Sequence, residues 1–221
     1  MTGAHAPGRG LTLLVLAKAP RAGVSKTRLA PAYGPAGAAA LAAAALADTL
    51  EAVAAADCAR RVLVLGGTPD PALFPALPKG FDVVPQAGGG LGERIAVALA
   101  AVPGPALLIG MDTPQVTPGL LRLDLDDHGT DAWLGPAEDG GWWALGLRHS
   151  SRFARQVLDG VPMSTAQTGA EQRRRLVTAG LAVADLPRLR DVDEPDDARI
   201  VAAAAPGTRF AAAVRRLRGA A

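Results

Sequence analysis

Strand-like apolar runs alternate with longer helical segments along most of this chain, and no other feature limits its possible folds as strongly. The strand-like runs lie at 11–17, 61–66, 81–85 and 106–110. The first two are almost wholly apolar, as expected for strands that are buried on both faces. Helical segments lie at 34–56, 91–101 and 118–127. This alternation predicts βαβ units and an α/β fold in which helices flank a mixed, mainly parallel sheet.

The pattern changes after residue 130. Two strand-like runs at 132–136 and 142–147 are separated only by AEDGG, which predicts an insertion with mixed or antiparallel pairing beside the sheet. The remaining predicted elements are helices at 150–159 and 165–180, a strand at 181–185 and a helix at 194–205. No repeat or linker is visible. We therefore predict one domain at 11–205, a flexible N-terminus at 1–10 and a C-terminal helix at 206–221.

The composition is that of a globular protein, with 221 residues of which 49% are hydrophobic. A net charge of +2 and an aromatic content of 4% argue against nucleic acid as a partner, because no basic stripe alternates with aromatic residues. Cys58 is the only cysteine, which excludes an intrachain disulfide and a cysteine-rich zinc site. No stretch is predicted to cross a membrane. These features favour a cytoplasmic protein.

An alternative for the N-terminus is a signal peptide. Arg9, the apolar run at 11–17 and the small residues around Lys18 resemble its charged end, apolar core and cleavage site. Cleavage there would remove the first predicted strand.

The first predicted strand leads into a basic loop, KAPRAGVSKTRLAP. Its cations could hold phosphate, and its small residues allow backbone N–H groups to approach a ligand. The residues concerned are Lys18, Arg21, Gly23, Ser25, Lys26 and Arg28. Open α/β sheets bind ligands at the carboxyl ends of their strands, where this loop is expected to lie. The alternative is a solvated basic loop with a turn at Pro20.

Acidic residues stand at the ends of two predicted strands. Asp112 follows one strand in GMDTP, and DVDEPDD at 191–197 follows the last. One carboxylate from each place could hold a Mg²⁺ or Mn²⁺ that bridges phosphate oxygens, with Asp191 or Asp193 as the second ligand. The alternatives are that Asp112 caps the next segment and that Asp193 caps a helix beginning near Pro195.

The loop GPAEDGGWWALGL carries two further acids. Glu138 and Asp139 could accept hydrogen bonds from a sugar-like acceptor or act as a base, or they could simply belong to a tight hairpin turn. Trp142 and Trp143 point to opposite faces of a strand, so we expect one in the core and the other at a pocket.

The motif QAGGGLGERI precedes a predicted helix. Gly90, Gly92 and Arg94 could bring the backbone close to a nucleobase or ribose. The motif does not follow the first strand, so we do not interpret it as a dinucleotide-binding fingerprint.

Together, these five motifs resemble the bacterial family of uncharacterised GT-A-fold glycosyltransferase-like proteins. They are more distantly similar to 2-phospho-L-lactate guanylyltransferase and the molybdenum-cofactor nucleotidyltransferases. The resemblance covers about 11–205 and implies a single-domain GT-A (nucleotide-diphospho-sugar transferase) fold. It also implies that Lys26 and Arg28 contact phosphates, that Asp112 binds metal and that Asp193 is the second ligand.

Three positions depart from the pattern of that family. Met111 stands where serine is expected, Trp142 and Trp143 stand where tyrosines are usual, and Met163 in PMST stands where tryptophan is expected. These departures leave the phosphate-binding residues unchanged and concern the acceptor side.

The function that the resemblance implies is that of a metal-dependent transferase with a nucleotide-activated donor and a small-molecule acceptor. Glycosyl transfer from a nucleotide-diphospho-sugar is the first prediction, with Mg²⁺ or Mn²⁺ on the diphosphate and Glu138 or Asp139 at the acceptor hydroxyl. The alternative is a nucleotidyltransferase that joins an NTP to a phosphorylated small molecule and releases pyrophosphate. A second alternative is a nucleotide-binding protein without catalysis.

Overall fold

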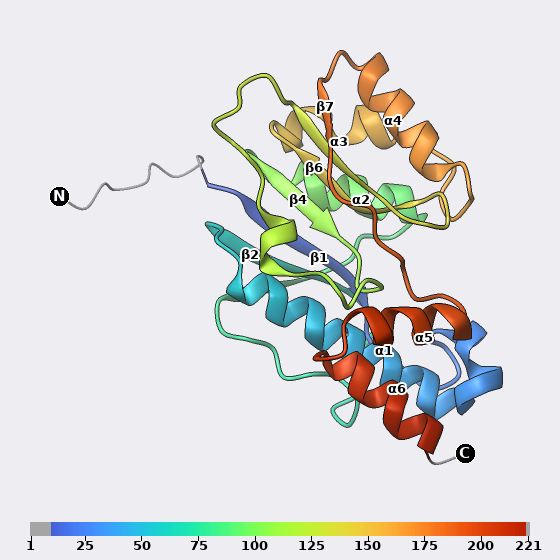
Figure 1. Ribbon diagram of the computed structural model, residues 1–221. Coiled ribbons are helices and arrows are strands. Elements are labelled where there is room, and N and C mark those ends of the chain that lie inside the picture. Colours follow the sequence, from blue (N-terminus) through green and yellow to red (C-terminus); the bar gives the residue numbers. More distant parts are fainter. Residues whose placement is uncertain (1–9, 220–221) are drawn as a thin grey trace.

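A single mixed sheet runs through the computed structural model, in which residues 10–219 are described (Figure 1). Its strands are β1 (Thr12–Lys18), β2 (Arg60–Gly66), β3 (Phe81–Pro85), β4 (Ala106–Ile109), β5 (Ala132–Pro136), β6 (Trp142–Leu147) and β7 (Val183–Asp185). Their order across the sheet is β3-β2-β1-β4-β6-β5-β7. All neighbouring strands run parallel except β6, which is antiparallel to both β4 and β5. The predicted antiparallel pairing is thus confirmed, but β6 lies within the sheet rather than beside it.

Helices cover both faces of this sheet. The α-helices are α1 (Ala30–Ala55), α2 (Leu91–Ala100), α3 (Ser150–Leu158), α4 (Thr168–Thr178), α5 (Pro195–Ala204) and α6 (Arg209–Gly219). The two short 3₁₀ helices are η1 (Thr27–Leu29) and η2 (Pro118–Leu121). One face is covered by α1, with α5 and α6 packed outside it, and the other by α2, α3 and α4 (Figure 1). The α/β fold and its mainly parallel sheet are as the sequence predicts.

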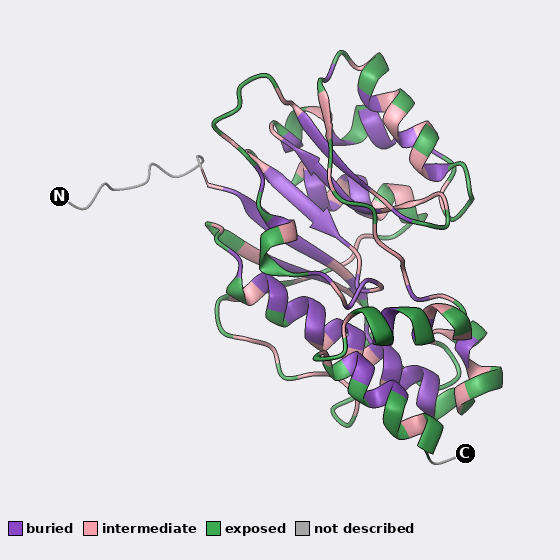
Figure 2. Ribbon diagram, viewed as in Figure 1, coloured by how far each residue is buried: buried purple, intermediate pink, exposed green. Residues whose placement is uncertain are grey.

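Alternating side chains of the central strands pack into two separate cores, one on each face of the sheet. Leu13 and Val15 of β1 pack with Leu46 and Leu50 of α1, whereas Leu14 packs on the opposite face with residues of α2 and α3. Figure 2 shows the resulting band of buried residues through the central strands and α1. Burying a leucine or valine side chain contributes about 1.5–3 kcal/mol, so these central strands form a rigid base for the loops at their ends.

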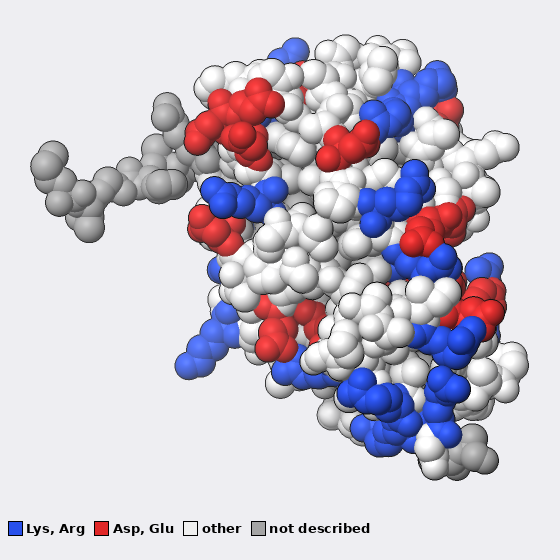
Figure 3. All heavy atoms as spheres, viewed as in Figure 1, with Lys and Arg blue, Asp and Glu red and all other residues white. Residues whose placement is uncertain are grey.

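A third core joins α6 to α1. Phe210 and Val214 of α6 pack against Leu41 of α1. The Asp48 carboxylate of α1 also accepts hydrogen bonds from the backbone N–H groups of Arg209 and Phe210, at 2.9 and 2.8 Å. A side chain of one helix therefore caps the first turn of another. Lys and Arg side chains gather over the C-terminal end of α6 in the space-filling view (Figure 3).

Helix α1 differs from its prediction in two ways. It begins at Ala30, and its helical geometry is interrupted at Gly34, whose φ is 69°, before it continues from Pro35. The segment Thr27–Ala55 is also long and apolar enough to cross a membrane by length and composition, which our prediction of no such segment missed. In the fold, 56% of its apolar window is buried inside the protein, as in a core helix.

The predicted helix at 118–127 is wrong. Only η2 forms there, because the Asp124 carboxylate accepts hydrogen bonds from the N–H groups of Asp126 and Asp127 at 3.1 Å each. Such a side-chain bond offers the backbone an alternative to the helix. Helix α4 likewise begins at Thr168 rather than Thr165. Residues 1–9, which hold most of the predicted flexible N-terminus and Arg9, lie outside the described residues, as do 220–221.

Candidate active site

A cavity of about 730 Å³ opens at the carboxyl ends of the central strands. Lys18 ends β1, Asp112 follows β4, Asp139 lies in the turn between β5 and β6, and Asp193 lies beyond β7. Strands β2 and β3 lie on one side of β1 and β4 lies on the other, so the strand order reverses here. Ligands of open α/β sheets bind at such a switch point.

At the centre of the cavity, Lys26 holds two carboxylates. Its Nζ lies 2.7 Å from Oδ1 of Asp112 and 2.9 Å from Oδ1 of Asp193. Its side chain is only 12% exposed, against 45% and 42% for the two acids. Burial lowers the pKa of Lys26, but the charges and hydrogen bonds of Asp112 and Asp193 outweigh burial and raise this pKa above its ordinary value. Lys26 is therefore a fixed ammonium group.

The backbone of the basic loop turns tightly before and at Lys26. Lys26 has φ 49° and ψ 47°, in the left-handed region, and Gly23 has φ 76°. The left-handed conformation costs a non-glycine residue about 1–2 kcal/mol, so neighbouring contacts must hold it. The Ser25 hydroxyl supplies one by accepting a hydrogen bond from the Arg21 N–H at 2.9 Å. Arg28 is more exposed, with guanidinium nitrogens 3.7 Å from Asp193 and from Glu194.

The acidic residues after β7 have two roles: some cap helix α5, and others line the cavity. Glu194 and Asp197 form a capping box at the start of α5, and Asp197 also pairs with Arg190 at 2.8 Å. Hydrogen bonds from the N–H groups of Asp193 and Glu194 to Asp197 fix the turn at 3.2 and 2.8 Å. The Asp193 carboxylate is thus not the helix cap and is directed to Lys26. A backbone bond of 2.9 Å from Val192 N to Asp112 O joins the two acidic segments.

Asp112 and Asp193 are the residues that could hold a divalent metal arriving with a nucleotide. Within residues 10–219, no group of three or more histidine, cysteine, aspartate or glutamate side chains could hold a metal ion. Mg²⁺ usually keeps several waters and binds through one or two carboxylates plus substrate phosphates, which matches this pair beside a basic loop.

A second pair of carboxylates, Asp139 and Asp191, also lines the cavity. Asp139 accepts a hydrogen bond from the Gly141 N–H at 2.7 Å, and Asp191 lines the cavity beside it. Burial, followed by the charges of Asp139 and Asp193, raises the pKa of Asp191 to about 6. Glu138 does not line the cavity and is paired with Arg190.

The two tryptophans lie in the two environments predicted for them, one in the core and one at the cavity. Trp143 is buried, and its indole N–H donates to the Pro187 carbonyl at 2.9 Å. Trp142 is partly exposed and lines the cavity.

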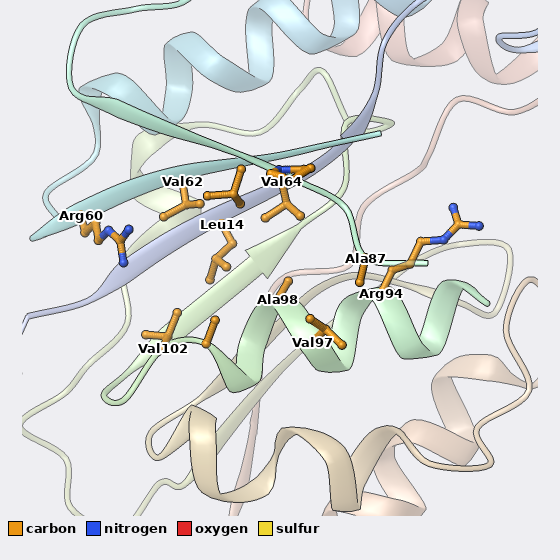
Figure 4. Close-up of a pocket in the computed structure, with 12 residues that line it drawn as sticks. Leu14, Arg60, Val62, Val64, Ala87, Arg94, Val97, Ala98 and Val102 are labelled. Atoms are coloured by element: carbon orange, nitrogen blue, oxygen red, sulfur yellow. The ribbon is translucent and has the colours of Figure 1, made fainter. Parts of the chain in front are cut away.

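A smaller hollow of about 220 Å³ lies between α2 and strands β2 and β3 (Figure 4). Apolar side chains such as Val62, Val64 and Val97 line it, and its charged residues are Arg60 and Arg94. No carboxylate, histidine or cysteine of the described residues lines it. This hollow has no group for metal or acid–base chemistry, so the larger cavity is the candidate active site.

Comparison with known proteins identifies the family of this chain. Residues 49–165 match a family described as an uncharacterized protein conserved in bacteria, DUF2064. The chain belongs to the DUF2064 family. A phosphoenolpyruvate guanylyltransferase of Streptosporangium roseum is 36% identical over 224 residues, which cover 95% of this chain and 93% of the relative.

Solved structures resemble this DUF2064 protein over most of its length. A putative nucleotide-diphospho-sugar transferase of Desulfovibrio desulfuricans G20 is 26% identical with a TM-score of 0.83, and the match covers 95% of each chain. Rv0371c of Mycobacterium tuberculosis H37Rv, solved as a complex with manganese, is 26% identical with a TM-score of 0.51. That match covers 87% of this chain and 97% of the other. The predicted family resemblance and the nucleotide-diphospho-sugar transferase-like fold are confirmed, and the chain is a nucleotide-utilising transferase.

The remaining predicted site residues are only partly brought together in this DUF2064 protein. Arg94 lines the cavity with Lys18 and Ser25, and its Nε donates to the Gly89 carbonyl at 2.9 Å. Other predicted residues lie near the cavity but do not line it: Arg21, Gly23, Gly90 and Gly92.

Sequence reasoning did not identify Gln86 or Thr165 as residues of the cavity. Gln86 donates from its side chain to the carbonyls of Ala17 and Val64, at 2.8 and 3.2 Å, and so ties the ends of β1 and β2. Its position directly after β3 was the available signal.

Proposed function

We propose that the protein transfers a glycosyl group from a nucleotide-diphospho-sugar to an acceptor hydroxyl, with a divalent metal on the donor diphosphate. The observation that carries this proposal is that Asp139 lines the same cavity as the cluster of Lys26, Asp112 and Asp193. A hydroxyl acceptor needs a group that can take its proton, and a diphosphate leaving group needs cations. The two requirements meet in one cavity.

On the donor side, the residues of the basic loop suit a diphosphate. The Lys26 ammonium and the Arg28 guanidinium would stabilise the negative charge that develops on the leaving nucleoside diphosphate. Asp112 and Asp193 would hold Mg²⁺ or Mn²⁺, which supplies Lewis-acid stabilisation of the diphosphate when bound. Lys18 and Arg94 border the same space and could neutralise further phosphate charge.

On the acceptor side, Asp139 is better placed as a base than Glu138, which Arg190 engages. Asp139 would take the acceptor proton while the acceptor oxygen bonds to the anomeric carbon of the donor sugar. The bond between that carbon and the diphosphate oxygen breaks, and its electron pair leaves with the nucleoside diphosphate. Such general base catalysis contributes about 10²–10⁴-fold to a rate.

Nucleotidyl transfer is a second candidate, and the relative from Streptosporangium roseum favours it. That protein is named a phosphoenolpyruvate guanylyltransferase and matches this chain over nearly its whole length. The cluster of Lys26, Asp112 and Asp193 would suit a triphosphate as well as a diphosphate. A phosphate nucleophile is already ionised, so this reaction would leave Asp139 without a role as base.

A donor assay separates the two reactions. The protein would be incubated with Mg²⁺ or Mn²⁺ and either nucleotide-diphospho-sugars or NTPs, and the release of nucleoside diphosphate and of pyrophosphate would be measured. We expect one nucleotide-diphospho-sugar to release its nucleoside diphosphate only when metal is present. Pyrophosphate release from an NTP would instead select nucleotidyl transfer. A thermal shift in the same samples reports donor binding, because a ligand at 100 times its Kd stabilises by about 2.7 kcal/mol.

A further inference from the structure

We divide the lining of this single cavity into two parts and name one of them the acceptor half. It consists of the lining residues Ala137, Asp139, Gly141, Trp142, Met163, Ser164, Thr165, Ala166, Thr168 and Asp191. We propose that this half binds an unphosphorylated polyhydroxyl acceptor, such as a sugar or cyclitol ring, and disfavours phosphorylated acceptors. The inference rests on the proposed glycosyl transfer and names the class of its acceptor.

The donor half is the rest of the lining, which includes Lys18, Ser25, Lys26, Arg28, Gln86, Arg94, Asp112 and Asp193. Except for Asp193, which follows β7 but contacts Lys26, the order of the strands separates the donor half from the acceptor half. Lys18 ends β1 and Gln86 follows β3, on one side of β4, whereas Trp142 begins β6 and Asp191 follows β7, on the other. Asp112, directly beyond β4, lies between the two groups of strands. A donor diphosphate at the basic loop and an acceptor between β6 and β7 would therefore meet near Asp112.

The lysine and arginine side chains that line the cavity all belong to the donor half, although the charge of Lys26 also lowers the pKa of Asp191 in the acceptor half. The cationic residues that line the cavity are Lys18, Lys26, Arg28 and Arg94, which belong to the segments that follow β1 and β3. Among the described residues that line the acceptor half, none is a lysine or arginine.

The arginines near the acceptor half are engaged in contacts of their own. Arg190 pairs with Glu138 and Asp197, and Arg188 donates to the Ala137 carbonyl at 3.1 Å. Lys26, whose charge lowers the pKa of Asp191, is itself paired with Asp112 and Asp193. A phosphate in the acceptor half would therefore face Asp139 and Asp191 without an unpaired lysine or arginine of the described lining residues to balance it. Juxtaposed like charges cost several kcal/mol, so such an acceptor is disfavoured.

The same residues suit hydroxyl groups. The Asp139 Oδ1 accepts the Gly141 N–H, and its Oδ2 accepts no hydrogen bond from the described residues, which leaves that oxygen for an acceptor hydroxyl. Asp191 offers a second carboxyl group, and Ser164 offers a hydroxyl. Trp142 adds a flat apolar surface, against which the C–H face of a sugar ring can pack.

Matched acceptor pairs test this proposal. With the donor identified as above, release of nucleoside diphosphate would be measured with glucose against glucose 6-phosphate, inositol against inositol 1-phosphate, and glycerol against glycerol 3-phosphate, with phosphoenolpyruvate as a further acceptor. We expect the preferred acceptor to be unphosphorylated and to exceed its phosphorylated partner by at least about tenfold in kcat/KM. The proposal is wrong if a phosphorylated compound is preferred, or if no unphosphorylated compound accelerates release.

Two variants sharpen the result. Ala166→Arg adds a cation at an exposed position of the acceptor half, and we expect it to improve the kcat/KM of the phosphorylated member of each pair. Asp159→Asn, at an exposed position that does not line the cavity, is the matched control and should change neither member. If Ala166→Arg left the discrimination unchanged, charge would not be its cause and the proposal would fail. The metal-dependent thermal shift with donor alone reports separately on the proposed function, because absence of that shift contradicts donor binding itself.

Discussion

The donor half and the acceptor half of the cavity differ in how their carboxylates are held. Asp112 and Asp193 are fixed by the buried ammonium of Lys26, at 2.7 and 2.9 Å. Asp139 and Asp191 are not joined by such an ion pair, and burial followed by the charge of Asp139 raises the pKa of Asp191. We propose that the first half binds metal and phosphate and that the second binds groups without negative charge. The variants below test this contrast, from the largest expected effect to the smallest.

The largest effect is expected in the donor half. Asp112→Asn removes one carboxylate of the metal pair, so we expect metal-dependent turnover to fall by about 10²–10³-fold while the fold persists. Turnover at saturating metal and the far-ultraviolet circular dichroism spectrum measure the two effects. Asp126→Asn, at an exposed position outside the cavity, is the control. Unchanged turnover in Asp112→Asn would remove the metal-site proposal.

A smaller loss is expected in the acceptor half. Asp139→Asn removes the proposed base, so kcat should fall by about 10²-fold with little change in donor affinity. Glycosyl transfer rates and the donor-dependent thermal shift measure these quantities. A parallel loss of donor affinity would mean that Asp139 belongs to the donor half and that the division drawn here is wrong.

For a substitution of Lys26 we expect a gain in metal affinity rather than a loss. Its ammonium repels a second cation near Asp112 and Asp193, so Lys26→Met should raise the Mn²⁺ affinity of the nucleotide-free protein by about tenfold. The same variant should weaken nucleotide binding, because a phosphate contact is lost. Electron paramagnetic resonance of free Mn²⁺ measures the first effect, with the exposed Lys79→Met as control. Equal or weaker Mn²⁺ binding would show that the metal binds elsewhere.

A change outside both halves tests whether the cavity is independent of the α1–α6 core. Asp48→Ala leaves the N–H groups of Arg209 and Phe210 without their acceptor, which should lower the free energy of unfolding by about 1–3 kcal/mol. Urea unfolding measures the loss, and the exposed Asp57→Ala should show little. Donor affinity of the folded Asp48→Ala protein should remain that of the wild type, and a change would link the two regions.

The smallest effect concerns the pH dependence of stability. The pKa of Asp191 is raised from its ordinary 3.8 to about 6, so the folded protein binds more protons there than the unfolded chain between these values. Its contribution to stability is therefore present below about pH 4 and is lost as the pH rises through about 6. In metal-free buffer, Asp191→Asn should raise Tm relative to wild type at pH 8 more than at pH 4.5. The reverse trend would contradict the burial of this carboxyl.

The donor half was largely predictable from the sequence, because its parts are local. A buried strand followed by a basic loop fixes the place of Lys26, and Asp112 stands directly beyond another strand of the same sheet. Since parallel strands end at one edge, the meeting of these residues follows from topology alone. Asp193 was harder to assign, since only the observed capping by Glu194 and Asp197 frees its side chain for Lys26.

The acceptor half was less predictable, because its residues come from separate segments. Sequence reasoning found Asp139 and Trp142, but it proposed Glu138 equally, since nothing in AEDGG shows that Arg190 engages this side chain 52 residues away. The error at 118–127 has a similar origin: the Asp124 side chain competes with helical hydrogen bonds, which apolar periodicity does not reveal.

The most direct test of the account is a crystal structure with Mn²⁺ and a nucleoside diphosphate, in which anomalous scattering locates the metal. The proposed donor half predicts a manganese peak about 2 Å from carboxylate oxygens of Asp112 and Asp193. It also predicts that the Lys26 ammonium moves from these carboxylates to the diphosphate. A structure in which Lys26 still bridges the two carboxylates while nucleotide and metal bind elsewhere would contradict it.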